Sequence, residues 1–194
     1  RAAGCELPPG DDGGLRVRRP GPLPPDVVAT IGTASFLVFH PGAAVPARRP
    51  TTGRSAQMVR ALAAAGHRVV VTGDESERDL TAAVAGEHGV DLGGRTTLAD
   101  LGAVFAAAHV VVAPNTGPAH LAAAVGAPVV SLFAPVVPAS QWSPYGNNVI
   151  RLGDQDARCR ATRARSCPVP GHPCLDGITD GELLAAVDEL GGSS

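Results

Sequence analysis

Short valine-rich runs alternate with longer amphipathic segments from residue 36 onward, and this alternation constrains the fold more than any other feature. The apolar runs, each short enough for a buried strand, lie at 36–39, 69–71, 90–92, 110–112, 129–133 and 149–152. Helices are predicted between and after them, at 52–65, 77–88, 97–108, 119–125 and 180–190. Strand, helix and strand at this spacing predict βαβ units with right-handed crossovers. The predicted fold class is α/β, a doubly wound, Rossmann-like parallel sheet.

Two parts of the chain differ in composition. Residues 1–34 are rich in proline and glycine, so we expect a linker or the remnant of a preceding domain there. Residues 35–194 are expected to form one nucleotide-binding domain ending in a helix. With 194 residues, of which 44% are hydrophobic, the chain can bury a core. It begins with Arg1 rather than methionine, so we expect a piece of a longer protein.

Charge and composition exclude several function classes. The net charge of -2 gives no excess of positive charge of the kind that binds nucleic acid, so no nucleic-acid partner is expected. No apolar run approaches the roughly 18 residues of a membrane span, and no signal peptide begins the chain, so a cytoplasmic location is expected. Three of the four cysteines are Cys159, Cys167 and Cys174, close to His172. Their spacing matches no zinc finger, so we expect reduced thiols and no metal, with zinc as the minor alternative.

Polar, glycine-bearing turns follow four of the predicted strands. They are His40-Pro41-Gly42, Thr72-Gly73-Asp74, Gly93-Gly94-Arg95 and Asn115-Thr116-Gly117. In an open parallel sheet, ligands bind outside the carboxyl ends of the strands. These turns therefore predict a binding site, although glycine at such a turn also has a purely conformational use.

The segment 115–120 carries the strongest signal for an anion. Pro118 suits a first helical turn, Gly117 permits close approach to the backbone, and free N–H groups there attract phosphate. Thr116 adds a hydroxyl, and His120 lies one turn further on. The alternative is an ordinary helix cap by Asn115 or Thr116.

Two further features could contact a nucleotide. Arg48 and Arg49 lie in a loop before a predicted helix, where a guanidinium can bind a diphosphate. Glu77 could accept hydrogen bonds from a ribose diol, or could simply be an acidic residue favoured at a helix start. No P-loop motif and no G-x-G-x-x-G motif is present.

Several motifs in order resemble the C-terminal half of the heptosyltransferases of glycosyltransferase family 9. The resemblance covers about residues 36–190 and rests on His40-Pro41-Gly42-Ala43, Pro46-Ala47-Arg48-Arg49, Val71-Thr72-Gly73, Glu77, Gly94-Arg95-Thr96, Asn115-Thr116-Gly117-Pro118-Ala119-His120, Leu132-Phe133, Trp142-Ser143-Pro144-Tyr145-Gly146 and Cys174-Leu175.

The resemblance implies an enzyme of the two-domain GT-B type. Such an enzyme transfers a sugar, here expected to be heptose, from ADP-heptose or another nucleotide sugar to a glycan or lipid-linked acceptor. Transfer proceeds with inversion and requires no cofactor or metal. The expected partners are the donor, an acceptor at the inner face of the plasma membrane and the N-terminal domain of the same protein. That domain is expected to supply the general base, so no catalytic residue is assigned here and the chain alone is expected to be inactive.

The resemblance also assigns the donor site by position. Arg48 takes the place of a lysine facing the phosphates, Glu77 faces the ribose, and Thr96 and Thr97 lie near the adenine. The full predicted set is Gly42, Ala43, Arg48, Thr72, Gly73, Glu77, Thr96, Thr97, Asn115, Thr116, Gly117, Pro118 and His120.

Two positions depart from the family pattern and leave other functions open. Asn115 stands where the family typically has aspartate, and Pro50-Thr51 replaces a Trp-Pro pair. One alternative is therefore a degenerate module that binds a nucleotide sugar without catalysis. Another, suggested only by the fold class, is a nucleotide-dependent oxidoreductase.

Overall fold

Six parallel strands form one sheet in the computed structural model, which describes residues 6, 8–11, 14–17, 20–146 and 148–192. In spatial order the strands are β3 (Gly89–Asp91), β2 (Val69–Val71), β1 (Leu37–Phe39), β4 (Val111–Pro114), β5 (Val129–Leu132) and β6 (Val149–Leu152). All neighbouring pairs are parallel, and Val38 pairs with Val70 on one side and Val111 on the other. The predicted doubly wound α/β fold is confirmed, and the strand order reverses between β1 and β4.

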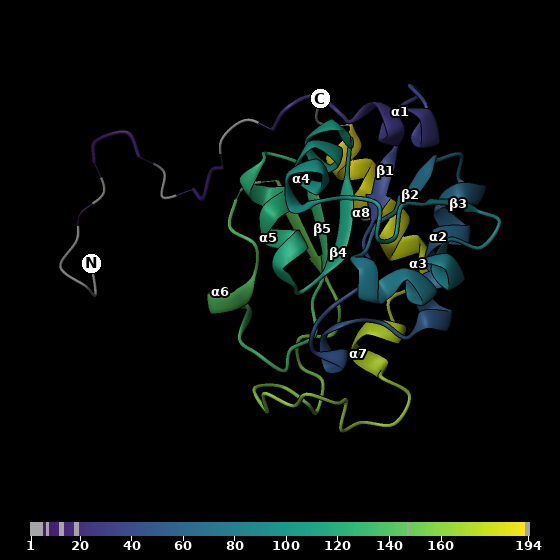
Figure 1. Cartoon of the computed structure of the whole chain (residues 1–194). Coiled ribbons are helices and arrows are strands. Elements are labelled where there is room, and N and C mark those ends of the chain that lie inside the picture. The colour runs from purple at the N-terminus through teal and green to yellow at the C-terminus, as the bar shows by residue number, and fades with distance from the viewer. Residues whose placement is uncertain (1–5, 7, 12–13, 18–19, 147, 193–194) are drawn as a thin grey trace.

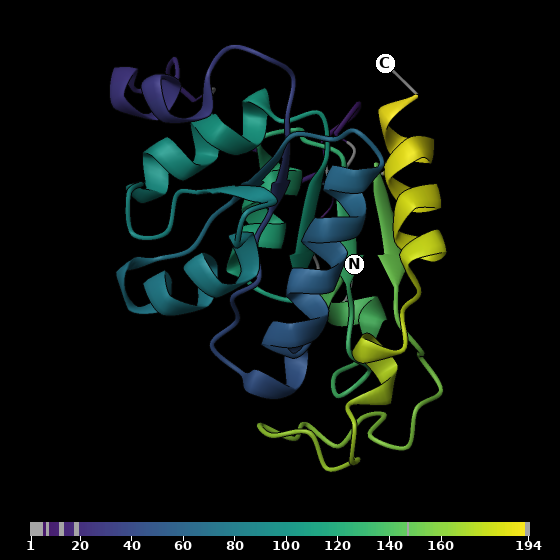
Figure 2. The same ribbon diagram turned by 90° about the vertical axis from the view of Figure 1, so that its right-hand side faces the viewer.

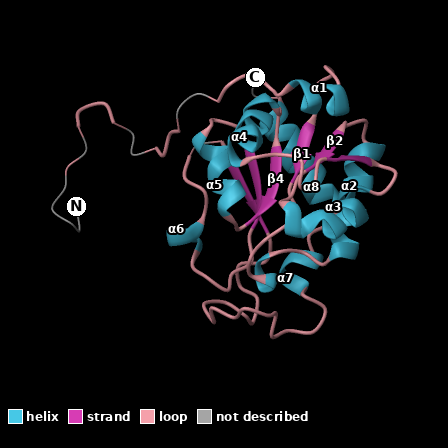
Figure 3. Cartoon of the chain, in the orientation of Figure 1, coloured by secondary structure: helices cyan, strands magenta, loops and turns pink. Residues whose placement is uncertain are grey.

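Helices cover both faces of the sheet, as Figures 1 and 3 show. One face packs against α2 (Thr52–Ala64), α3 (Arg78–Ala85) and α8 (Asp180–Gly191). The other face packs against α1 (Pro25–Ile31), α4 (Leu98–Ala107) and α5 (Gly117–Ala124). Because side chains alternate along a strand, Leu37 and Phe39 face the first layer while Val38 faces the second. Both faces of the sheet are therefore covered by helices and shielded from water, which explains why the central strands are continuous apolar runs.

Helix α1 lies inside the segment predicted to be a linker or the remnant of a preceding domain, and residues 25–31 are not an irregular linker. Val27 and Ile31, one turn apart, are 2% and 0% exposed and pack against the sheet. Pro25 occupies the first turn of this helix, where a missing N–H is harmless, so the proline starts the helix instead of preventing it.

The remaining boundaries depart from the predicted ones only in detail. The helix predicted from Glu77 begins as a 3-10 turn, η2 (Glu75–Glu77), and α3 ends before Gly86, whose φ is +48°. Three short elements were not predicted: η1 (Pro46–Arg48), α6 (Ala139–Trp142) and α7 (Pro173–Asp176). Among the described residues, no helix is long and apolar enough to cross a membrane.

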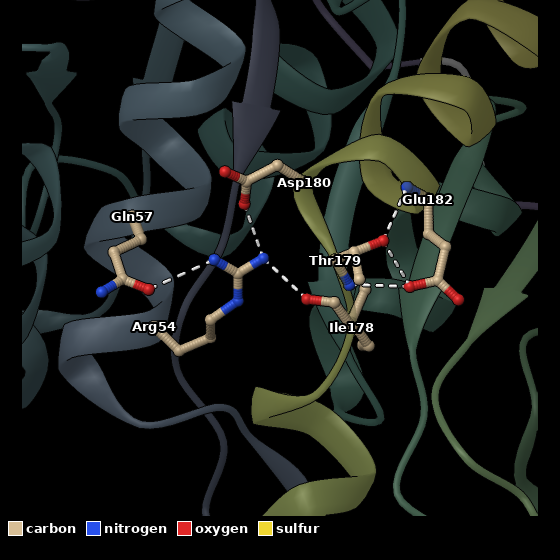
Figure 4. Close-up of polar contacts among 6 residues, drawn as sticks. All are labelled: Arg54, Gln57, Ile178, Thr179, Asp180 and Glu182. Atoms are coloured by element: carbon tan, nitrogen blue, oxygen red, sulfur yellow. Dashed lines mark hydrogen bonds and ion pairs between the residues drawn. The ribbon is translucent and has the colours of Figure 1, made fainter.

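The C-terminal helix α8 lies beside α2 (Figure 2), and Arg54 of α2 links the two helices (Figure 4). Arg54 donates from Nη2 to the carbonyl oxygen of Ile178 at 2.7 Å and to Oδ1 of Asp180 at 2.6 Å. Thr179 caps α8, since its hydroxyl accepts from the backbone N–H of Glu182 and the Glu182 carboxylate accepts from the backbone N–H of Thr179. The helix predicted at 180–190 is confirmed, and its buried residues Leu183, Ala186, Val187 and Leu190 pack in the core beside the sheet.

Replacing Arg54 with methionine should lower the free energy of unfolding by about 1 to 2 kcal/mol, because the Ile178 carbonyl loses its charged donor. Most of this loss comes from the carbonyl contact, since the Asp180 side chain is 52% exposed and its ion pair is screened by water. Urea unfolding of the variant would measure it. Arg60→Met, at an exposed position of the same helix, is the matched control and should change stability little.

Candidate functional site

A cleft of about 760 Å³ lies where the loops after β1, β2 and β4 meet the segment that enters α4. This is the carboxyl edge of the sheet beside the strand-order reversal, where ligands of doubly wound sheets bind. The walls therefore come from turns that the sequence marks as polar and glycine-bearing.

Seven of the thirteen predicted site residues line this cleft: Ala43, Gly73, Glu77, Thr96, Thr97, Thr116 and Pro118. The other six are not part of its wall: Gly42, Arg48, Thr72, Asn115, Gly117 and His120. Lining residues absent from the predicted set are His40, Ala44, Arg49, Asp74, Ser76, Asp79, Leu80, Leu98 and Leu101. His40 and Asp74 stand in the quoted turns, so sequence position alone could have added them.

His40 forms a buried polar contact beneath the cleft. Its Nδ1 shares a hydrogen bond of 3.1 Å with the hydroxyl of Thr72, and its Nε2 lies 3.9 Å from Oε2 of Glu77. The imidazole is 4% exposed, and burial lowers its pKa from 6.5 to about 4, only partly opposed by the charge of Asp74. At neutral pH the imidazole of His40 is therefore uncharged where it adjoins the carboxylate of Glu77.

Glu77 already has a structural partner. Its carboxylate accepts from the backbone N–H of Asp74 at 3.1 Å and closes a capping box, while Asp74 accepts from Ser76. The bonds to Ser76 are the main reason that the pKa of Asp74 lies below its ordinary value. A Cβ on Gly42 would collide with the Glu77 carboxylate, so glycine is required there for Glu77 to reach this position. Glu77 therefore acts as a cap of the turn, and its position in the cleft wall is also compatible with hydrogen bonds to a ribose diol.

Within the described part of the chain, the start of α5 offers one unpaired backbone donor, the N–H of Gly117, because Pro118 has no N–H and the N–H of Ala119 donates to the carbonyl of Thr116 at 3.1 Å. Thr116 is at the N-cap position, but its side chain makes no capping hydrogen bond, so the alternative of an ordinary hydroxyl cap is wrong. Nothing lies within 4 Å of a Cβ built on Gly117, and Asn115 is 2% exposed with its Nδ2 lacking a partner. His120, one turn further, is partly buried, and burial lowers its pKa. The unpaired N–H of Gly117, the helix dipole and an open approach together suit an anion.

The two arginines of the β1–α2 loop have different surroundings. Arg49 lines the cleft, whereas Arg48 lies on the ring of Trp142 with its guanidinium carbon 5.2 Å from the ring centroid. The family resemblance assigned the donor phosphates to Arg48, whereas in the structure Arg49 is the arginine that lines the cleft. Loop residue Ala47 donates to the carbonyl of Arg165, and this bond fixes the loop against the C-terminal segment.

The opposite end of the cleft is more apolar. Leu80, Leu98 and Leu101 line it together with Thr96 and Thr97. The hydroxyl of Thr97 is already used, because it donates to Oδ2 of Asp100 at 2.6 Å and caps α4. This end can therefore pack against a flat ring but offers few free side-chain donors.

The cysteine segment does not form a recognisable metal site. Cys159 and Cys174 are 1% exposed, in the core beside α8, and Cys167 is half-buried. Burial, with Cys159 and Cys167 nearby, raises the pKa of Cys174 to about 12, so it stays a thiol. Among the residues that the structure describes, no group of three or more His, Cys, Asp or Glu side chains could hold a metal ion. Cys5 lies outside them.

Comparison with known proteins identifies the family. The family model for glycosyltransferase family 9 (heptosyltransferase) matches residues 26–172, well over half of the chain. The chain belongs to glycosyltransferase family 9. Membership explains the order of the turns around the cleft and removes the basis for the oxidoreductase alternative.

Individual relatives agree with this membership. Lipopolysaccharide heptosyltransferase 3 of Escherichia coli is 30% identical over 162 residues, which are 80% of this chain and 47% of that protein. The family 9 glycosyltransferase of Veillonella parvula DSM 2008 superposes with a TM-score of 0.70 at 19% identity, covering 87% of this chain and 50% of that one. ADP-heptose lps heptosyltransferase II of Escherichia coli gives 0.68 at 20% identity, covering 85% and 50%. The two structures share the fold of this chain, which spans about half the length of the relatives it matches.

Proposed function

We propose that this chain is the donor-binding half of a GT-B glycosyltransferase that transfers a sugar, heptose in the simplest case, from an ADP-sugar with inversion. The observation that carries the proposal is the 760 Å³ cleft at the strand-order reversal, which combines an open helix start with an arginine and an apolar end. A nucleoside diphosphate has the matching order of groups: a flat base, a diol and two phosphates.

The diphosphate would lie at the start of α5. Charge develops on the leaving diphosphate as the bond to the sugar breaks, and fixed donors stabilise it without reorganisation. The backbone N–H of Gly117, the guanidinium of Arg49 and, beside it, Arg48 would provide these donors. No metal is needed for this role in the proposed mechanism.

The nucleoside would extend toward α4. Glu77 would accept from the ribose hydroxyls, held by its contact with the Asp74 backbone and by His40 beneath it. The adenine would lie against Leu80, Leu98 and Leu101, near Thr96 and Thr97. The name of one structural relative, an ADP-heptose heptosyltransferase, supports an ADP donor.

The acceptor side of the reaction is assigned to another domain. An N-terminal domain of the same protein would bind a glycan or lipid-linked acceptor at the inner membrane surface and supply the general base. No residue of the present chain is assigned as a catalytic residue.

Calorimetry on the 194-residue chain tests the donor proposal. We expect ADP to bind with a dissociation constant in the micromolar range, at least tenfold more tightly than UDP or GDP. Equal affinities would contradict an adenine-selective site, and absence of binding by all three nucleotides would contradict the donor site itself.

Asn115 favours one second candidate, a module that binds a nucleotide sugar without catalysis. An amide at the position of the family's aspartate keeps a hydrogen bond but carries no charge. Release of ADP from ADP-heptose by a protein that includes the preceding domain, dependent on acceptor, would exclude this candidate. ADP binding without any release in that assay would support it.

A further inference from the structure

Arg48 and Trp142 come from segments far apart in the sequence and meet at one point. Arg48 ends the 3-10 turn η1 after β1, and Trp142 ends the short helix α6 after β5. The guanidinium carbon lies 5.2 Å from the centroid of the indole ring, within the range of a cation–π interaction. Trp142 is the only tryptophan of the chain and is 43% exposed.

No described residue forms a hydrogen bond or an ion pair with the guanidinium of Arg48. Its Nε is buried without a partner. An aromatic ring contacts the face of a guanidinium and leaves the N–H groups on its edge available. A carboxylate partner would instead occupy those N–H groups and compete with a phosphate.

The backbone of the loop is held independently of the indole. The N–H of Ala47 donates to the carbonyl of Arg165 at 3.0 Å. At the end of the loop, Thr51 donates from its backbone N–H and its hydroxyl to the carboxylate of Asp176, at 2.9 and 2.7 Å. Trp142 therefore contacts the side chain of Arg48 while other residues fix the loop, so its effect can be separated from loop folding.

We propose that Trp142 is a positioning residue that holds the guanidinium of Arg48 in place, with its edge free, for the phosphate groups of the nucleotide donor. This inference rests on the proposed function. An arginine side chain has about 2 kcal/mol of rotamer entropy to lose when it binds an anion. Contact with the ring removes part of that freedom before the ligand arrives, which is the usual benefit of preorganisation.

A double-mutant cycle measured by calorimetry with ADP tests the inference. Four proteins are compared: the wild-type chain, Trp142→Leu, Arg48→Ala and the double variant. A cation–π contact at an exposed site is worth about 0.5 to 1 kcal/mol, so Trp142→Leu should weaken ADP binding about 2- to 5-fold. Arg48→Ala should weaken it about tenfold, and Trp142→Leu should cause no further loss when Arg48 is absent.

Conservative replacement and fluorescence provide independent readouts. Trp142→Phe keeps an aromatic face, so it should retain most of the affinity that Trp142→Leu loses. Because Trp142 is the only indole, saturating ADP should change the tryptophan emission of the wild-type chain and change it less in Arg48→Ala. Urea unfolding of every variant identifies any that fail to fold, and Trp142→Phe then serves in the cycle instead.

Three results would overturn the inference. Equal losses from Trp142→Leu in the presence and absence of Arg48 would show that the indole acts independently of the arginine. Unchanged affinity in Trp142→Leu would show that the contact has no effect on binding. If the wild-type chain binds no ADP, the proposed function fails together with this inference, whereas the first two results refute the positioning role alone.

Discussion

Replacing Gly117 with alanine should weaken ADP binding by about 30-fold, or roughly 2 kcal/mol, without lowering the free energy of unfolding. Nothing lies within 4 Å of the added Cβ, and α5 begins at this residue, so the folded chain accommodates the methyl group. A phosphate oxygen that accepts from the backbone N–H of Gly117 must approach to about 3 Å, and the methyl group would stand in its path. The loss should therefore appear in calorimetry with ADP and not in urea unfolding.

Gly53→Ala is the matched control for this substitution. Gly53 also lies in the first turn of a helix, α2, and a Cβ there meets nothing within 4 Å. Gly117 lies between the lining residues Thr116 and Pro118, whereas neither neighbour of Gly53 in the chain lines the cleft. ADP affinity should therefore stay unchanged in Gly53→Ala while stability rises by a few tenths of a kcal/mol or more. Equal ADP affinities for Gly117→Ala and Gly53→Ala would contradict close approach of the diphosphate to the α5 backbone.

The fold was largely predictable from the sequence because its strands are buried on both faces. Such strands appear as continuous valine runs, and the helices between them are bounded by recognisable residues, such as Thr97 before α4 and Gly66 after α2. Helix α1 was missed for a physical reason. The prolines of this segment were interpreted as helix breakers. The apolar pair Val27 and Ile31, which packs against the sheet, is the feature that indicates the helix.

The site was predictable as a set of turns and less so as individual side chains. Sequence position brings Gly73, Thr116 and Pro118 to the carboxyl edge, because parallel strands place all their ends there. It cannot decide between Arg48 and Arg49, since Arg48 ends a 3-10 turn and Arg49 follows it with extended backbone, and tertiary contacts such as that of Arg48 with Trp142 determine where each side chain lies.

The role of Thr97 before α4 could be predicted from the sequence. The spacing Thr97–Asp100 is that of a capping box, with aspartate in place of the usual glutamate, and this spacing predicts that the Thr97 hydroxyl bonds within the chain. Burial of His40 has no such local pattern. Its environment depends on Thr72 and Glu77, which adjoin a neighbouring strand of the sheet.

Lowering the pH from 6.5 to about 4 should destabilise the protein, because the buried His40 resists protonation in the folded state. Burial lowers the pKa of this residue from 6.5 to about 4, so between these values the unfolded chain binds a proton that the folded chain excludes. The contribution of neutral His40 to the free energy of unfolding is complete above pH 6.5, decreases as pH falls, and is lost when pH reaches about 4. Since one unit of pKa corresponds to about 1.4 kcal/mol, the free energy of unfolding should fall by about 3 kcal/mol across this window. Urea unfolding at a series of pH values would measure it.

His40→Gln isolates this contribution, because glutamine can bond to Thr72 but does not titrate. Burial also lowers the pKa of His120, which acts in the same direction, so the wild-type curve minus the His40→Gln curve gives the contribution of His40 alone. The lowered pKa values of Asp74 and Glu182 act mainly below this window, since the stabilisation from these carboxylates begins to be lost only near their ordinary pKa values of 3.8 and 4.5. Parallel stability curves for the two proteins would contradict a buried, neutral His40. If the variant does not fold, an NMR titration of the His40 ring decides the same question, and a pKa near 6.5 would refute the assignment.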